Sequence, residues 1–92
     1  MHYVYILKSK DKNWVYVGST NDLRRRFKQH ENGENQSTKA YKPFRLVHYE
    51  AYLAKSDAVR REDYLKTTKG KSTLRMMLKD SLLINEDTNI DV

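Results

Sequence analysis

Tyr3-Val4-Tyr5-Ile6-Leu7 decides the fold of this chain together with a second stretch, Trp14-Val15-Tyr16-Val17-Gly18. Their aromatic and branched aliphatic side chains favour two strands, the first of them buried on both faces. The polar residues between the two stretches form a loop of hairpin length. If Lys8 pairs near Asn13, Tyr5 lies opposite Tyr16, so both phenols share one face of the hairpin.

A helix is expected directly after the second strand. Gly18 ends that strand, and Ser19-Thr20-Asn21-Asp22 supplies side chains suited to cap a helix that runs to about Glu31. The inward-facing stripe of this helix is expected at Leu23, Phe27 and His30. Arg26 and His30 are spaced i, i+4 and therefore lie on one side of the helix. Phenols, a guanidinium and an imidazole thus come together in one strand–turn–helix unit.

The remainder of the chain predicts one more strand and two more helices. Pro43 introduces a strand over 44–52. Ser56 is expected to cap a helix over 57–66, and Ser72 a third helix. The apolar face of the third helix is expected at Leu74, Met77, Leu78 and Leu82, widened by Met76 and Leu83.

The order ββαβαα predicts a small α/β (α+β) domain in which helices flank a three-stranded sheet. We place this domain at residues 1–83 and an acidic, flexible tail at 84–92. The chain of 92 residues is too short for a second domain.

The composition is basic. The chain has 18 Lys and Arg against 12 Asp and Glu, a net charge of +6 and a pI near 9.6. Three of the acidic residues lie in the tail, and no Lys or Arg follows Lys79. This excess of positive charge attracts polyanions, although a solvated surface kept for solubility would explain it as well.

Several other classes of protein are excluded or disfavoured. The chain has no cysteine, so it forms no disulfide and no thiolate metal site. Its three histidines are too scattered for a zinc site by spacing. A strand pattern begins at the N-terminus without the apolar segment of a signal peptide, and no apolar run approaches the roughly 18 residues needed to cross a bilayer. We therefore expect a soluble cytoplasmic protein.

Glu62 is a carboxylate in an apolar helix stripe. In the helix over 57–66, Ala58, Glu62 and Leu65 fall on one face. A buried carboxylate is costly unless it is paired with a cation or holds a metal. The structural alternative is a salt bridge with Arg61 or Arg26.

The remaining polar residues are harder to assign. Arg26 suits a phosphate because the guanidinium fork matches two phosphate oxygens. Arg24 and Arg25 point elsewhere and either grip phosphates or are solvated. His48 alternates with Leu46 and Glu50 and resembles a packed strand histidine. Trp14 is expected in the core or as a stacking platform. Further candidates for nucleic-acid contacts are Gly18, Lys42, Lys66, Lys69 and Lys71.

Tyr3-Val4-Tyr5 and Tyr16-Val17-Gly18 resemble the two name-giving motifs of the GIY-YIG nuclease superfamily. The helix with Arg26 and His30 follows them as in the family, and Glu62 comes at the expected distance. The chain is similar to the small stand-alone members that resemble the N-terminal domain of the excision-repair endonuclease. It departs from the motif by Tyr3 in place of glycine and by valines in place of both isoleucines.

The resemblance implies an endonuclease that hydrolyses DNA, or RNA, with one divalent cation, Mg²⁺ or Mn²⁺. It implies that Tyr16 is the general base or positions the attacking water, and that Tyr5 orients the site. Arg26 would stabilise charge on the scissile phosphate, and His30 stands where relatives have His or Tyr. Glu62 would hold the metal, and Gly18 would allow a close turn beside the phosphate.

Two other functions remain open from the sequence. The main alternative is a non-catalytic nucleic-acid-binding module that kept the nuclease fold, and the third is a protein-interaction adaptor. The basic surface would bind backbone phosphates with little sequence readout. Specificity would then come from substrate shape or from a targeting partner protein.

Overall fold

The computed structural model describes residues 1–84. Its sheet is antiparallel and has the strand order β2-β1-β3, with β1 at His2–Ser9, β2 at Val15–Thr20 and β3 at Phe44–Tyr52. Three α-helices are α1 at Leu23–Glu31, α2 at Lys55–Leu65 and α3 at Thr68–Met77, and two short 3₁₀ turns are η1 at Lys39–Tyr41 and η2 at Ser81–Leu83. The predicted α+β class and the order ββαβαα are confirmed. From residue 85 on, the predicted tail lies outside the described residues.

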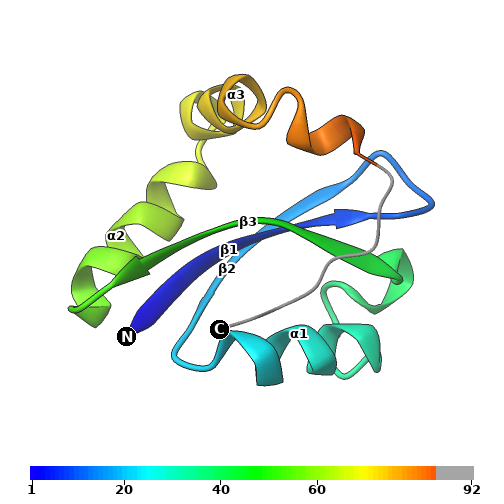
Figure 1. Ribbon diagram of the computed structural model, residues 1–92, viewed down its shortest axis with the longest axis horizontal. Coiled ribbons are helices and arrows are strands. Elements are labelled where there is room, and N and C mark those ends of the chain that lie inside the picture. The colour runs from blue at the N-terminus through cyan, green and yellow to red at the C-terminus, as the bar shows by residue number, and fades with distance from the viewer. Residues whose placement is uncertain (85–92) are drawn as a thin grey trace.

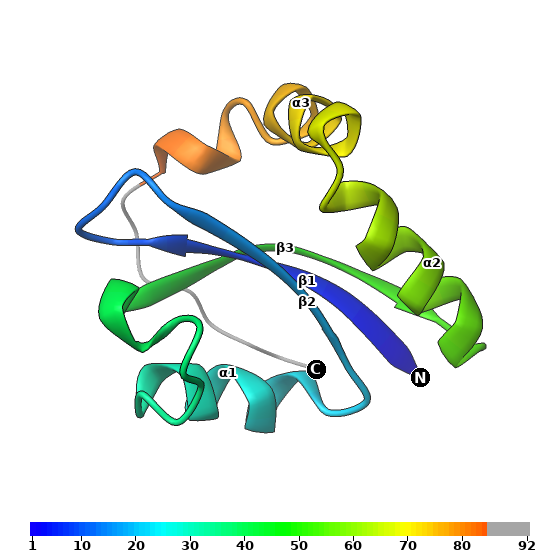
Figure 2. The same ribbon diagram turned by 180° about the vertical axis from the view of Figure 1, so that it is seen from behind.

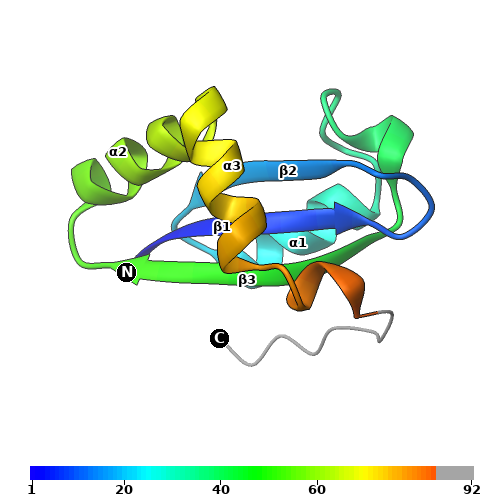
Figure 3. The same cartoon turned by 90° about the horizontal axis from the view of Figure 1, so that it is seen from above.

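The helices cover both faces of the sheet. Figure 1 shows α1 on one face and α2 and α3 on the other, and Figure 2 shows the same layers from behind. From above, α3 crosses the strands while α2 lies toward the β2 side of the sheet (Figure 3). No helix within residues 1–84 is both long enough and apolar enough to cross a bilayer.

The hairpin register differs from the prediction by two residues. Tyr5 pairs with Gly18, and Tyr16 pairs with Leu7. The turn closes where the Ser9 N–H donates to the Trp14 carbonyl at 3.0 Å, one residue later on both strands than predicted. A shift by two residues preserves the side-chain alternation, so both tyrosines still face α1. Gly18 does not end β2, which continues to Thr20.

A β-bulge separates the two halves of β3. Leu46 pairs with Leu7 and His48 pairs with Ile6, so Val47 is the additional residue. Leu46 therefore packs on the α1 side of the sheet, whereas His48 and Glu50 face α2 and α3. The regular alternation that the sequence suggested for Leu46, His48 and Glu50 is wrong, because the bulge interrupts it.

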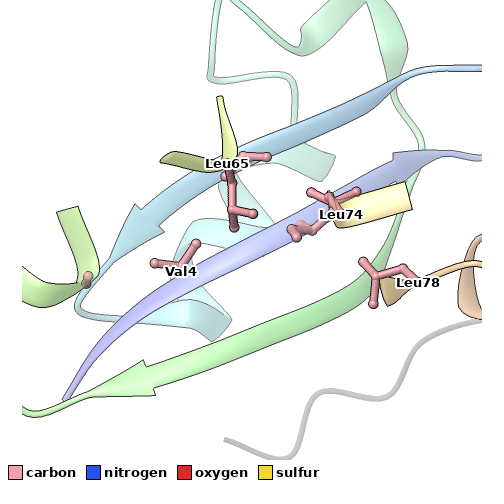
Figure 4. Packing of buried hydrophobic residues seen from close by; sticks show 7 residues of the cluster. Val4, Leu65, Leu74 and Leu78 are labelled. Carbon is pink, nitrogen blue, oxygen red and sulfur yellow. The ribbon is translucent and has the colours of Figure 1, made fainter. Parts of the chain in front are cut away.

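Two apolar clusters hold the layers together. The cluster under α1 contains Tyr5, Leu7, Leu23, Phe44 and Leu46. The other lies under α2 and α3, where Val4 of β1 packs near Leu65, Leu74 and Leu78 (Figure 4). Burying one leucine or valine side chain contributes about 1.5–3 kcal/mol, so these clusters fix the positions of the helices on the sheet.

Both later helices begin earlier than predicted. Ala54 precedes α2 without a side-chain cap, so Ser56 lies in the first turn. Thr67 caps α3 by accepting from the Gly70 N–H at 3.0 Å, and Ser72 is interior. A Cβ on Gly70 would meet the Tyr64 carbonyl oxygen, which shows that this glycine permits close packing of α3 on α2.

The apolar face of α3 is narrower than predicted. Leu74 and Leu78 are buried, whereas Met77 is 44% exposed and Met76 is 80% exposed. Leu82 packs against the cluster, but Leu83 is exposed.

Candidate active site

A buried hydrogen-bonded chain links β1, α1 and the loop after α1. The Tyr5 hydroxyl lies 2.8 Å from His30 Nε2, and His30 Nδ1 lies 2.8 Å from Thr38 Oγ1. All three side chains are buried, because Leu23 and the neighbouring face of α1 pack His30 against the sheet. The inward position predicted for His30 is therefore correct.

Burial sets the protonation states of this chain. Burial, with a smaller effect of the Arg26 charge, lowers the pKa of His30 to about 4, so its imidazole is neutral near pH 7. Burial and the neighbouring Tyr16 raise the pKa of Tyr5, so this phenol keeps its proton. A neutral imidazole has one donor and one acceptor nitrogen, so it can hold Tyr5 and Thr38 at once in one fixed orientation.

Gly18 lets both tyrosine rings approach the strand closely. A Cβ at Gly18 would lie 2.5 Å from the Tyr5 hydroxyl oxygen and 2.9 Å from Cε2 of Tyr16. The Tyr16 ring lies 5.4 Å from the His30 ring and 6.3 Å from the Tyr5 ring, measured between centroids. Tyr16 is partly exposed, because β2 is an outer strand of the described sheet. Thus Tyr16 is the phenol that can reach a ligand at the surface.

Glu62 comes from the other face of the sheet. Ser19 Oγ donates to Glu62 Oε1 at 2.7 Å, and the Lys66 ammonium lies 2.9 Å from Oε2. The Glu62 side chain is only 17% exposed and shares its face with buried Ala58 and Leu65, as predicted. Its cation is Lys66, four residues on, and neither of the two arginines that we considered from the sequence.

Arg61 instead binds Glu50. The guanidinium donates to both Glu50 oxygens, at 2.9 and 3.2 Å. Tyr52 donates to the same carboxylate at 2.6 Å, and His48 Nε2 lies 3.0 Å from it. Burial alone would raise the pKa of Glu50, but these hydrogen bonds outweigh burial and lower it to about 2. This network joins α2 to β3 and does not include Tyr5 or Tyr16.

The arginines of α1 divide as predicted. Arg26 is half-buried and lines a depression of about 250 Å³ with Ser19 and Ala58. Arg24 and Arg25 are exposed, and Arg25 lies 3.9 Å from Asp22. Of the three guanidiniums, only that of Arg26 therefore lies in the depression next to Glu62's partner Ser19.

The lysines that we considered for nucleic-acid contacts are spread over the surface. Lys66 and Lys71 line a larger depression of about 380 Å³ beside Tyr16. Lys69 is exposed in the first turn of α3, and Lys42 is exposed beside Gly33 on the α1 side. The structure thus brings two of the four lysines next to Tyr16.

The metal-donor set is small. Within residues 1–84 no three His, Cys, Asp or Glu side chains cluster as a metal site. Glu62 and the Ser19 hydroxyl offer hard oxygen donors at a partly solvated position, which suits a Mg²⁺ ion that keeps most of its waters. These residues fit such an ion on condition that Lys66 releases the Glu62 oxygen.

The sequence did not reveal the roles of three residues in this site. Thr38 lies in an irregular loop and carries no local signal, and Ser19 was expected to be a helix-capping residue. Lys66 was expected to contact nucleic acid, but its pairing with Glu62 could have been predicted, because a Glu and a Lys spaced i, i+4 are neighbours on a helix.

Comparisons with known proteins identify a family and related proteins. The family model of the GIY-YIG catalytic domain matches residues 1–75. A UPF0213 protein of Clostridium perfringens is 39% identical over 83 residues, which cover 89% of this chain and 88% of the relative. UPF0213 protein YazA of Bacillus subtilis is 39% identical over 66 residues, which cover 71% and 66% of the two chains. The solution NMR structure of a UPF0213 protein from Bacillus halodurans has a TM-score of 0.52 and 39% identity, and the match covers 83% of each chain.

Proposed function

Because this chain belongs to the GIY-YIG catalytic-domain family, we propose that it is a divalent-metal-dependent endonuclease that hydrolyses phosphodiester bonds in DNA. One observation carries the proposal. Tyr16 belongs to β2, Arg26 of α1 lines a depression with Ser19 of β2, and Glu62 of α2 accepts a hydrogen bond from Ser19. Near one strand, a phenol can activate a water, a guanidinium can stabilise charge on a phosphate, and a carboxylate can hold a divalent cation.

The two tyrosines have different roles in this proposal. Tyr5 stays protonated because its pKa is raised, so it is a positioning residue that His30 holds in place. Tyr16 is the partly exposed phenol and contacts the attacking water, whose proton it helps to remove. The water oxygen bonds to phosphorus, the bond to the leaving oxygen breaks, and the leaving oxygen takes up a proton.

In this proposal, Arg26 stabilises the negative charge on the reacting phosphate. His30 is neutral near pH 7 and cannot supply a cation, because its pKa is about 4. The half-buried Arg26 guanidinium can bind two phosphate oxygens at once and stabilise the negative charge that develops there. Its depression next to Ser19 places it on the same edge as Glu62.

Glu62, with Ser19 beside it, would hold one Mg²⁺ or Mn²⁺ ion. The ion would polarise a phosphoryl oxygen and stabilise the leaving oxygen. The chain's own contribution is to orient the carboxylate through the hydrogen bond that the Ser19 hydroxyl donates.

A second candidate function, a binding module without catalysis, has one observation in its favour. The Lys66 ammonium lies 2.9 Å from Glu62, and an ion pair of this kind is also consistent with a purely structural role for the carboxylate. The basic surface would then bind nucleic acid through backbone phosphates alone. In both functions a targeting partner protein could add specificity.

Cleavage assays separate the two candidates. Single-stranded, duplex and branched DNA and the matching RNA are incubated with Mg²⁺, Mn²⁺ or a chelator. Tyr16→Phe and Glu62→Gln should each lower the rate by about 100-fold or more, as expected for lost general-base or metal catalysis. Tyr49→Phe on β3 and Asp63→Asn on α2 are matched controls at exposed positions. Binding without cleavage under every condition would favour the binding module.

A further inference from the structure

A pocket beside Tyr16 is larger than the catalytic groups themselves need. It has a volume of about 380 Å³ and opens along the end of the hairpin loop, Asn13 and Trp14, and the first half of β2, from Val15 to Val17. Its opposite wall consists of Lys66, at the end of α2, and residues of α3. This volume is within the range of pockets that take small molecules, about 300–1,000 Å³.

The apolar part of the pocket is held rigidly. Trp14 lines it and stacks on Tyr41 with a centroid distance of 3.8 Å and an interplanar angle of 7°. Tyr16 also stacks on Trp14, with a centroid distance of 6.0 Å. Val17 and Leu74, both buried members of the core under α3, also line the pocket. An aromatic and aliphatic surface of this kind suits a flat, apolar ligand face.

The rim is positively charged. Lys66, Lys71 and Arg75 all line the pocket and are exposed, and none of the described residues lining it is Asp or Glu. Lys8 and Arg45 extend the positive charge beyond Arg75. Burial, together with repulsion from these two arginines, lowers the pKa of Lys8. Lys66 is paired with Glu62 at 2.9 Å, so the phosphate contacts fall to Lys71 and Arg75, whose positive charge attracts phosphates.

We propose that this pocket seats one unpaired base next to the scissile phosphate, while Lys71 and Arg75 bind the adjoining phosphate of the same strand. The inference rests on the proposed nuclease function, because Tyr16 lines the pocket and is also the group that contacts the attacking water. A base inside a duplex is stacked and paired and cannot enter, so the substrate class is nucleic acid with an unpaired nucleotide at the cleavage point.

The base contact can be tested without any cleavage. The probes are thymidine 3′,5′-bisphosphate and deoxyribose 3,5-bisphosphate, which lacks the base. Trp14 is the chain's only tryptophan, so its fluorescence reports on the pocket. Thymidine bisphosphate should bind about tenfold more tightly than the baseless compound, change the Trp14 emission and shift the amide resonances of Val15 and Val17. Equal affinities, or shifts away from these residues, would overturn the proposal.

Variants separate the base from the phosphates. The double change Lys71→Ala and Arg75→Ala should weaken both probes about equally, whereas Val15→Tyr, which narrows the pocket with a good strand former, should weaken only thymidine bisphosphate. Lys28→Ala with Lys79→Ala removes two exposed cations that do not line the pocket and should change neither affinity. If Val15→Tyr binds both probes like the wild type, while NMR shows it folded, the base lies elsewhere.

Cleavage distinguishes failure of this inference from failure of the proposed function. A single abasic residue is moved along a single-stranded oligonucleotide, and the cut at a fixed phosphate is measured. Loss of cutting only when the abasic residue adjoins that phosphate supports the pocket. Cutting that does not depend on the abasic position refutes the pocket and leaves the nuclease intact. Base-dependent binding without cutting on any substrate refutes the nuclease and leaves the pocket intact.

Discussion

The Tyr5 hydroxyl lies 2.8 Å from His30 Nε2, and neither side chain is more than 1% exposed. The contact joins the central strand to α1. Thr38, in the loop after α1, binds the other ring nitrogen of His30. Burial disfavours the charged form of this histidine in the folded state, so protonation of His30 favours unfolding.

Acid should therefore destabilise the protein through His30. Its pKa is about 4 when folded and near 6.5 when unfolded, so the unfolded state binds more protons between these values. The stability is fully present above about pH 6.5 and is lost as the pH falls toward 4, by about 3 kcal/mol. Urea unfolding between pH 7 and 4 measures the loss. His30→Gln should remove most of this dependence and His2→Gln should keep it; the same slope in His30→Gln would assign the effect to other groups.

Gly18→Ala should damage the site more than its size suggests. The added methyl group would lie 2.5 Å from the Tyr5 hydroxyl oxygen, so Tyr5 must move and its bond to His30 must lengthen. Overpacking of a dense core costs about 1–3 kcal/mol. Urea unfolding gives the cost, and the ring resonances of Tyr5 and Tyr16 report the displacement. Ser72→Ala, at an exposed position inside α3, leaves the rings untouched and serves as the control. Unchanged ring resonances in Gly18→Ala would contradict the close approach.

Arg61→Met should be destabilising, although Arg61 is not placed in the site. It would leave the Glu50 carboxylate, 19% exposed, without its bidentate partner. Both side chains of the pair are partly exposed and Glu50 keeps its bonds to Tyr52 and His48, so the loss should be about 1–3 kcal/mol. Arg60→Met is the matched control, because the Arg60 side chain is 74% exposed. Adding Glu50→Gln to Arg61→Met should restore part of the stability in urea unfolding. A loss no larger than that of Arg60→Met would show that the pair contributes little.

Local sequence was enough to predict the elements but not where they meet. Strand-forming residues predict β3 over 44–52, and this matches the structure. Capping chemistry predicts a cap of α1 within Ser19 to Asp22, and the structure has it at Asp22. Gly70 lies inside α3, although a glycine is typical of a helix boundary, because a Cβ there would meet the Tyr64 carbonyl oxygen. The cap is therefore Thr67 and not the predicted Ser72.

The candidate site was only partly predictable for the same reason. The parity of the hairpin placed the two phenols on one face even with the wrong register, since a shift by two residues leaves every side chain on its own side. The partner of Glu62 depends instead on which long side chain reaches it across the folded surface. Arg61 turns toward Glu50, which leaves Lys66 as the nearer cation.

Lys66→Ala should raise the affinity for a divalent cation. The Lys66 ammonium pairs with Glu62 at 2.9 Å, and the hydrogen bond to Glu62 is the main cause that raises the pKa of Lys66. A cation at Glu62 must displace it, and the pair is partly exposed, so its removal should tighten Mn²⁺ binding by about fivefold. Paramagnetic broadening of the Ser19 and Glu62 amide resonances measures this affinity without any substrate. Lys69→Ala, which removes an exposed lysine in the first turn of α3, should bind Mn²⁺ like the wild type. Weaker or equal binding by Lys66→Ala would mean that Lys66 does not compete with the metal, and broadening centred elsewhere would remove Glu62 as its ligand.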